Sequence, residues 1–169
     1  EKIGQCIEIV TAPENHIKKC GSLSAFLKQY PIGALHCSGE LQNARMTVVD
    51  DYKKIVEEYN KYSKVPLLFN NELENGTDSY GLTVLPSFAA LAACNDLDLA
   101  FDYGKAVGME ARKCCANILN NCVVDMDIYP FTGMDTRSIG DDREKVVAIA
   151  KKIVEGVQSQ NVISVIKHF

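Results

Sequence analysis

The feature that most limits the fold of this chain is a regular alternation of short apolar runs with longer amphipathic segments. Between the runs, apolar residues recur at spacings of three and four, which is the pattern of a helix buried along one side. The predicted strands are Gln5–Val10, Ile32–Cys37, Val65–Asn70, Ile118–Val124 and Val162–Ile166. The predicted helices are Ser22–Tyr30, Val48–Tyr62, Val84–Ala93 with Pro86 in its first turn, 95–115, and 141–157 with Asp141 and Glu144 as its capping residues.

The strand runs show little alternation of polar and apolar residues, which indicates a parallel α/β sheet buried on both faces. An open doubly wound sheet and a segment of a barrel both fit this pattern. The nucleotide-binding versions of the open sheet need a glycine-rich turn after the first strand. Residues 11–16 instead read Thr-Ala-Pro-Glu-Asn-His, which disfavours a nucleotide-binding domain.

Length and charge limit the domain count and the kinds of partner. A chain of 169 residues suits a single domain, so we expect residues 1–169 to share one fold. The net charge is −4 and the isoelectric point about 5.4, so no overall field attracts nucleic acid or anionic lipid. No apolar run approaches the roughly 18–20 residues that span a bilayer. We therefore expect neither nucleic acid nor a membrane as a partner.

The cysteines favour a reducing compartment. They are odd in number and irregularly spaced, and no Cys-x-x-Cys occurs, so neither a disulfide framework nor a zinc site is indicated. Most have apolar neighbours in the sequence, so we expect reduced cysteines in the core of a cytoplasmic protein that needs no metal or other cofactor. The seven are Cys6, Cys20, Cys37, Cys94, Cys114, Cys115 and Cys122.

Polar side chains directly follow three of the predicted strands. They are Asn70, Asn71 and Glu72 after the third, Asp125 and Asp127 after the fourth, and Lys167 and His168 after the fifth. In a barrel of parallel strands the carboxyl ends converge on one rim, where active sites are built. These residues are therefore candidates for a common site.

Three of these candidates, together with one residue in a nearby loop, have side chains that suit a polyhydroxylated ligand. Lys167 and His168 donate hydrogen bonds, and Glu72 can accept two from neighbouring hydroxyls. Arg137, in the loop after the fourth strand, carries a planar guanidinium that can hold two hydroxyls at once. The alternative for each is an ordinary solvated strand end or surface loop.

A second chemistry is conceivable after the fourth strand. Asp125 and Asp127 are two residues apart, so on an extended chain they share a face and could form an acid–base pair of carboxylates. The stretch 135–142 also has an ordinary interpretation, in which Asp141 caps the following helix after the turn at Gly140.

Four ordered blocks of sequence resemble the family 3 glycoside hydrolases. Residues 65–76, Val-Pro-Leu-Leu-Phe-Asn-Asn-Glu-Leu-Glu-Asn-Gly, are similar to that family's I-P-L-L-I-A-x-D-Q-E-G-G, and 85–87 with the alanine-rich stretch after them resemble its F-P-x-x-x-A-L-A-A-T. Asp127 with 136–141, Thr-Arg-Ser-Ile-Gly-Asp, is similar to L-D-V-N…T-R-S-F-G-x-D, and 165–169 match A-x-x-K-H-F. The blocks span nearly the whole chain, and its opening, Glu-Lys-Ile-Gly-Gln, also resembles the beginning of the family's sequences.

The resemblance implies the N-terminal part of a (β/α)8 barrel of the TIM type, with about five parallel strands alternating with helices. It implies a retaining β-glycosidase, of the β-glucosidase or β-N-acetylhexosaminidase type, that works through a covalent glycosyl-enzyme. Carried over by position, Glu72, Arg137, Lys167 and His168 would bind the sugar of a β-glycoside substrate. The Thr-Arg-Ser-Ile-Gly form is nearer the β-N-acetylglucosaminidase branch.

The departures from the family pattern set further expectations. Glu72 stands where an aspartate is usual, and Leu73 and Asn75 replace a glutamine and a glycine. The family's nucleophilic aspartate, and the acid–base histidine of the nearer branch, follow the K-H-F block, so we expect the catalytic barrel to continue beyond Phe169 and this chain alone to be inactive. The alternative is a non-catalytic half-barrel that binds carbohydrate or assembles, as a homo-oligomer or with another chain, to cover its open edge.

Overall fold

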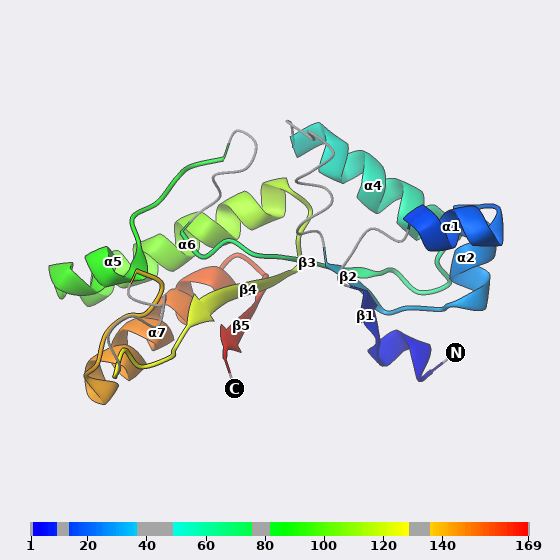
Figure 1. The fold of residues 1–169 in the computed structure, drawn as a ribbon. Coiled ribbons are helices and arrows are strands. Elements are labelled where there is room, and N and C mark those ends of the chain that lie inside the picture. Colours follow the sequence, from blue (N-terminus) through cyan, green and yellow to red (C-terminus); the bar gives the residue numbers. More distant parts are fainter. Residues whose placement is uncertain (1, 10–13, 37–48, 76–81, 129–135, 169) are drawn as a thin grey trace.

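The computed structural model describes residues 2–9, 14–36, 49–75, 82–128 and 136–168. Helices and strands alternate along these residues (Figure 1). In chain order the elements are η1 (Gly4–Cys6), β1 (Glu8–Ile9), α1 (Glu14–Cys20), α2 (Leu23–Gln29), β2 (Ala34–His36), α4 (Val49–Tyr62), β3 (Leu68–Asn71), α5 (Phe88–Cys94), α6 (Leu97–Lys113), β4 (Ile118–Val123), α7 (Arg143–Gln158) and β5 (Ile163–Lys167).

The strands form one parallel sheet in the order β1-β2-β3-β4-β5. A doubly wound sheet reverses its strand order at a switch point. Here each strand pairs with the next one in the sequence, which is the order of a barrel wall. Figure 1 shows an arched band of strands between α1, α2 and α4 at one end and α5, α6 and α7 at the other. The structure thus decides between the two parallel arrangements that the sequence left open.

Side-chain caps fix where several helices begin. The hydroxyl of Ser22 accepts the N–H of Ala25 at 3.1 Å at the start of α2. The predicted cap Asp141 is wrong: Asp142 caps α7, with Oδ1 accepting the N–H groups of Glu144 and Lys145 at 2.9 and 3.0 Å. One residue of difference matters because only the residue next to the first turn can reach its unpaired N–H groups.

Two other predicted boundaries are also wrong. The helix expected from Val84 begins at Phe88, because Ser87 caps it and Pro86 lies before the first turn. The first strand is shorter than expected, since Gln5 belongs to η1 and its Nε2 donates to the carbonyls of Pro31 and Ile32 at 3.1 Å each. The short helix α1 was not predicted at all.

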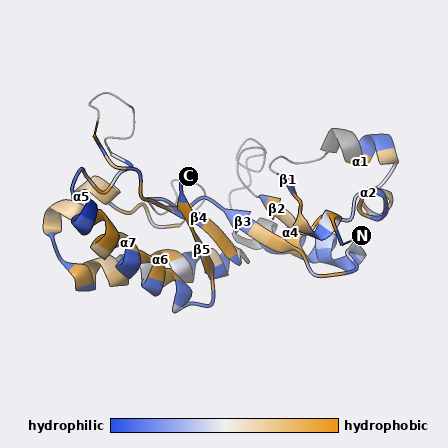
Figure 2. Ribbon diagram, turned by 90° about the horizontal axis from the view of Figure 1, so that it is seen from below, coloured by the Kyte–Doolittle hydropathy of each residue, from blue (hydrophilic) through white to orange (hydrophobic). Residues whose placement is uncertain are grey.

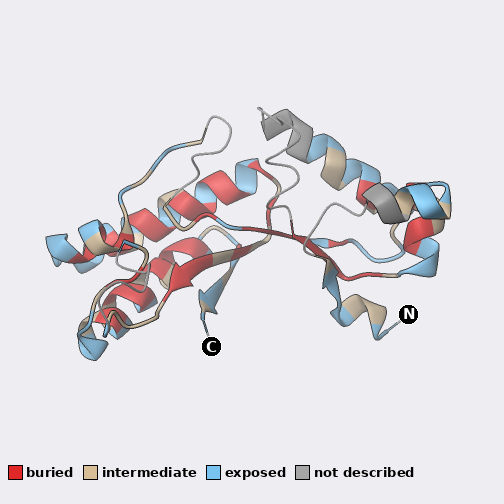
Figure 3. Ribbon diagram, in the orientation of Figure 1, coloured by how far each residue is buried: buried red, intermediate tan, exposed pale blue. Residues whose placement is uncertain are grey.

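Two apolar clusters hold the helices on the sheet. The N-terminal core joins α2 and α4 to β2 and β3 and contains Leu23, Phe26, Leu27, Ile32, Leu35, Tyr59, Leu67, Phe69 and Cys114. The larger C-terminal core joins α5, α6 and α7 to β4, and its fully buried members include Phe88, Val107, Leu119, Ile153 and Val157. Figure 3 shows the buried stripes of α6 and α7 turned toward one another and toward β4, and Figure 2 shows their apolar colouring.

Backbone contact between α6 and α7 depends on glycine. A Cβ on Gly104 would lie 2.1 Å from the carbonyl oxygen of Ile153, and one on Gly156 would lie 2.2 Å from that of Phe101. Real Cβ atoms do not approach a carbonyl oxygen so closely, so the two helices can be this near only where both residues lack a side chain. This contact fixes the spacing of the helices that flank β4 and β5.

The first three strands present different chemistry on their two faces. Ile9, Leu35 and Phe69 pack in the N-terminal core, so their neighbours in the sequence point to the opposite face. There Oε1 of Glu8 accepts the side-chain N–H of Asn70 at 2.8 Å and lies 3.5 Å from Nδ1 of His36. This face of β1–β3 is therefore polar rather than filled with the branched apolar side chains usual inside a barrel.

The expectation of core cysteines holds for only part of the set. Cys114 and Cys122 are buried, and burial raises the pKa of their thiols to about 11 and about 12. Cys6 and Cys94 are exposed, which is contrary to the prediction, and Cys37 lies outside the described residues. The prediction rested on apolar neighbours in the sequence, and such neighbours do not show which side of a helix or turn faces water. Among the described helices, none has the length and apolar character needed to cross a bilayer.

Candidate functional site

The candidate site lies beyond the carboxyl ends of β3, β4 and β5, and its centre is a carboxylate that the sequence analysis did not select. Glu74, three residues after β3, accepts two hydrogen bonds from Arg137, at 2.7 Å from Nε and 2.6 Å from Nη2. Nζ of Lys167, at the end of β5, forms an ion pair with the same carboxylate. Glu74 therefore joins the two cations that the sequence predicted as sugar ligands.

Burial and the two cations act in opposite directions on the pKa of Glu74. Its side chain is 15% exposed, and this burial by itself would raise the pKa. The hydrogen bonds and charges of Arg137 and Lys167 outweigh the burial, so the pKa of Glu74 lies below its usual value. The hydrogen bond to Glu74 in turn raises the pKa of Arg137. Glu74 and Arg137 are consequently both charged at neutral pH.

Glu72, the predicted carboxylate ligand, lies at the edge of this cluster. Its Oε1 is 3.5 Å from Nζ of Lys167, and its side chain is 46% exposed. It therefore reaches solvent, whereas Glu74 is largely enclosed by its partners. This is the arrangement expected if Glu72 contacts a ligand and Glu74 holds the cations in place.

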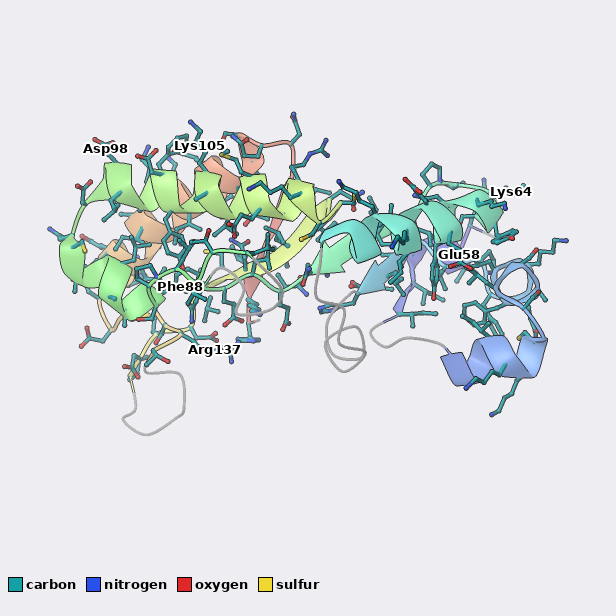
Figure 4. All side chains as sticks on the ribbon, turned by 90° about the horizontal axis from the view of Figure 1, so that it is seen from above. Glu58, Lys64, Phe88, Asp98, Lys105 and Arg137 are labelled. Atoms are coloured by element: carbon teal, nitrogen blue, oxygen red, sulfur yellow. The ribbon has the colours of Figure 1, made fainter. Side chains whose placement is uncertain are left out.

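Tyr103 fixes the segment that carries Glu74. The hydroxyl of this α6 residue lies 2.9 Å from the carbonyl oxygens of Glu74 and Pro86. Burial, followed by the negative charge of Glu74, raises the pKa of Tyr103, so the phenol stays protonated and can donate. The ring packs against Phe88 in the C-terminal core, with 5.7 Å between centroids. Figure 4 shows Arg137 and Phe88 on the same side of the molecule.

His168 lies beside this cluster and pairs with a different acid, Asp125. Its Nδ1 lies 2.6 Å from Oδ2 of Asp125, which also accepts the backbone N–H of His168 at 3.1 Å. Slight burial would raise the pKa of Asp125, but the bonds from His168 dominate and lower it. A charged carboxylate on Nδ1 stabilises the proton there and leaves Nε2 as the ring nitrogen that points away from Asp125. The negative charge of Asp125 also acts on Arg137, which places this pair beside the Glu74 cluster.

The two aspartates after β4 do not form the shared strand face that the sequence suggested. β4 ends at Val123, so both follow the strand. Asp125 binds His168, whereas the backbone of Asp127 pairs with Gly140 in the turn before α7, with an N···O distance of 3.0 Å. Their separate partners give no support to an acid–base pair.

The structure thus brings Glu72, Arg137 and Lys167 together, sets His168 beside them, and adds Glu74, Tyr103 and Asp125. A signal for Glu74 was present, because it lies two residues after Glu72 and can share its side of an extended chain. Nothing in the sequence pointed to Tyr103, whose role depends on how α6 packs. Within the described part of the chain, no group of histidine, cysteine and acidic side chains is arranged to hold a metal ion.

Fold and site together define a parallel (β/α)-barrel protein whose polar groups gather at the carboxyl ends of the strands. The chain belongs to glycosyl hydrolase family 3: the family's N-terminal domain matches residues 1–169. The five parallel strands of this chain, alternating with helices, match the TIM-barrel-like fold of that domain. The family membership and the fold predicted from the sequence are both confirmed.

Several solved structures share the fold. A family 3 β-N-acetylglucosaminidase from Paenibacillus sp. str. FPU-7 is 22% identical, with a TM-score of 0.82 over 99% of this chain and 32% of its own. A β-N-acetylhexosaminidase from Beutenbergia cavernae is 23% identical, with a TM-score of 0.77 over 99% and 52%. The β-glucoside phosphorylase BglX is 24% identical, with a TM-score of 0.75 over 100% and 29%.

At these identities the likeness concerns the fold alone, and the chain spans about half or less of each structure. A search of the curated proteins gave no match.

Proposed function

We propose that this protein takes part in the hydrolysis of β-glycosides and supplies the half of the active site that holds the terminal sugar. The main observation behind this proposal is that Glu72, Arg137 and Lys167 gather around Glu74 beyond the ends of β3, β4 and β5. The chain belongs to a family of glycoside hydrolases, and the active sites of (β/α) barrels lie at the rim formed by the carboxyl ends of the strands. The position of the cluster therefore supports a role in binding the substrate.

The charge balance of the cluster supports a neutral ligand. Two unpaired cations would favour an anionic substrate, but Arg137 and Lys167 are both paired with Glu74, and Lys167 also lies near Glu72. Two positive and two negative groups leave no net charge among these four residues. A neutral sugar, whose hydroxyls both donate and accept hydrogen bonds, matches such a surface better than a phosphate or a carboxylate does.

Each residue has a distinct role in this proposal. Glu72 accepts hydrogen bonds from sugar hydroxyls, while Arg137 and Lys167 donate to them, held in place by Glu74. Asp125 keeps the proton of His168 on Nδ1, which directs Nε2 toward the ligand. In this proposal these groups contribute to catalysis by binding and orienting the sugar.

The first test is sugar binding, which needs no turnover. Titration of the ¹⁵N-labelled protein with N-acetylglucosamine and with glucose, followed by NMR, should shift amide signals of residues 72–74, 137 and 167–168 with a single saturable curve. Arg137→Lys keeps the charge but loses the planar fork, and should raise Kd about tenfold or more. Lys105→Gln, an exposed substitution on α6, is the matched control and should leave Kd unchanged.

The outcomes separate the possible sugars and can reject the site. Tighter binding of N-acetylglucosamine would support a β-N-acetylhexosaminidase type, and tighter binding of glucose a β-glucosidase type. Equal Kd values for Arg137→Lys and the control would contradict the proposal that Arg137 binds the sugar. Release of a chromophore from β-glycosides by the native gene product, lost in Lys167→Ala, would extend the result from binding to catalysis.

A specific observation favours a second candidate, an assembly role. β5 is the last strand of the sheet, and its Ile163, Val165 and Ile166 are exposed by 51%, 36% and 58%. Exposed apolar residues on an edge strand are a typical site of pairing with another chain or copy. Light scattering of the purified protein distinguishes the roles: a stable oligomer with no sugar binding would support assembly over hydrolysis.

A further inference from the structure

A concave surface lies at the amino ends of β1, β2 and β3, where the strands begin. It is a hollow of about 610 Å³, bounded by η1, by the end of α2 with the turn into β2, and by the end of α4 with the turn into β3. This volume falls within the range of about 300–1,000 Å³ of small-molecule sites. Nothing in the proposed glycosidase function uses it.

The described residues around the hollow carry only positive charges. Lys2, Lys28, Lys61 and Lys64 line it, and none of its described lining residues is an aspartate or glutamate, although the chain as a whole carries a net charge of −4. Lys28 and Lys61 lie in the last turns of α2 and α4, where a cation offsets the negative end of the helix dipole. Lys2 and Lys64 lie outside the helices, so the helix dipole does not account for their positions at the hollow.

The floor of the hollow is apolar. Leu27 and Ile32 line it with only 6% and 4% of their surfaces exposed, while Tyr62 and Val65 stand on the rim at 41% and 50%. The ammonium group of Lys61 lies 5.5 Å from the ring centroid of Tyr62. A flat membrane surface cannot reach such a floor, so an occupant that uses both features must be compact.

The wall on the η1 side is held in a fixed position. A Cβ on Gly4 would lie 2.2 Å from the carbonyl oxygen of Pro31, and one on Gly33 would lie 1.9 Å from that of Gln5. The Gln5 side chain adds its two hydrogen bonds to the carbonyls of Pro31 and Ile32. The hollow is therefore preformed, which reduces the entropic cost of binding.

Distance separates the hollow from the candidate active site. Figure 4 places Lys64 at the opposite end of the molecule from Arg137. The hollow lies at the amino ends of the strands, whereas the Glu74 cluster lies beyond their carboxyl ends. A ligand in one cannot touch the residues of the other.

We propose that this hollow binds a small organic anion with an aromatic or aliphatic body. The lysines receive its carboxylate, sulfate or phosphate group, and the floor of Leu27 and Ile32 receives its apolar part. Charge complementarity selects the anion, because the charged side chains among the described lining residues are all lysines. The depth of the floor selects a compact molecule over a bilayer.

The test uses 8-anilinonaphthalene-1-sulfonate, a fluorescent aromatic anion, with the purified protein. We expect saturable binding at one site. The double substitution Lys28→Gln/Lys61→Gln should raise Kd about tenfold, which corresponds to about 1.4 kcal/mol. The matched double substitution Lys105→Gln/Lys113→Gln removes two exposed helix lysines, one of them also in a last turn, and should change Kd by less than about twofold.

Two further measurements keep the test decisive. N-Phenyl-1-naphthylamine, the uncharged counterpart of the probe, should bind about tenfold more weakly than the sulfonate. Val65→Asp places a carboxylate at an exposed position on the rim and should also weaken binding of the sulfonate, even if the lysine double variant were unstable. Absence of saturable binding, equal losses in the two lysine pairs, or equal affinity for the charged and uncharged probes would each overturn the proposal.

Discussion

The two ends of the sheet use cations in opposite ways. Beyond the carboxyl ends, Arg137 and Lys167 share the largely enclosed carboxylate of Glu74, and Glu72 lies beside them. Around the amino ends, four lysines line a hollow whose described lining residues include no acidic side chain. The first arrangement is locally neutral and held by short hydrogen bonds, so it suits a neutral ligand and contributes to stability. In the second, the described lining carries positive charge only, so it suits an anion and contributes little to stability.

The largest expected effect tests whether Glu74 holds the carboxyl end together. Glu74→Gln keeps the size of the side chain but removes the buried carboxylate charge that Arg137 and Lys167 share, so the free energy of unfolding should fall by about 2–3 kcal/mol. Urea denaturation at pH 7 measures this fall. Glu72→Gln, at an exposed position, should cost less than about 0.5 kcal/mol. Equal costs for the two variants would show that Glu74 is not the centre of the cluster.

An intermediate effect is expected when the pH is lowered. The pKa of Glu74 and that of Asp125 are both depressed in the folded protein. Their stabilising contribution is therefore complete above the unfolded values of about 4.3 and 3.9, and is lost as the pH falls through the lower folded values. Urea denaturation between pH 7 and pH 3 should show a smaller decrease for Glu74→Gln/Asp125→Asn than for the unmodified chain. Parallel curves would contradict the depressed pKa values.

The smallest effect is expected at the amino end. Lys28→Gln and Lys61→Gln each remove a favourable interaction with a helix terminus but also relieve repulsion among the lysines. Each should change the free energy of unfolding by less than about 0.5 kcal/mol. A loss as large as that of Glu74→Gln would mean that these lysines have structural partners, and the contrast between the two ends would fail.

Much of the fold followed from the sequence because apolar periodicity is local. The helix over 48–62 and the strands near 65–70 and 118–124 lie within a few residues of their predicted positions. Boundaries were less accurate because a helix begins where a side chain meets the free N–H groups, and Asp142 does so rather than its neighbour Asp141. The choice of a sequential strand order needed the structure or the family resemblance, since the alternation alone fits both parallel arrangements.

The site was predictable where its residues follow strands and hidden where it depends on packing. Glu72, Lys167 and His168 were selected because parallel strands end at the same rim, and Arg137 because of the loop that carries it. The structure places three of the four around a common carboxylate, and their binding of sugar stays a prediction. Tyr103 could not be selected, because only the approach of α6 to the segment after β3 brings its hydroxyl to Glu74.

That hydroxyl has one further consequence. Tyr103 has a single proton to donate, yet it lies within hydrogen-bonding distance of two carbonyls, those of Glu74 and Pro86. The two residues are twelve positions apart in the sequence, so a single hydroxyl holds both ends of the stretch between them. The entropic cost of closing a loop rises only slowly with its length. A change in the length of this stretch should therefore move Glu74 little, as long as both carbonyls keep their place at the hydroxyl.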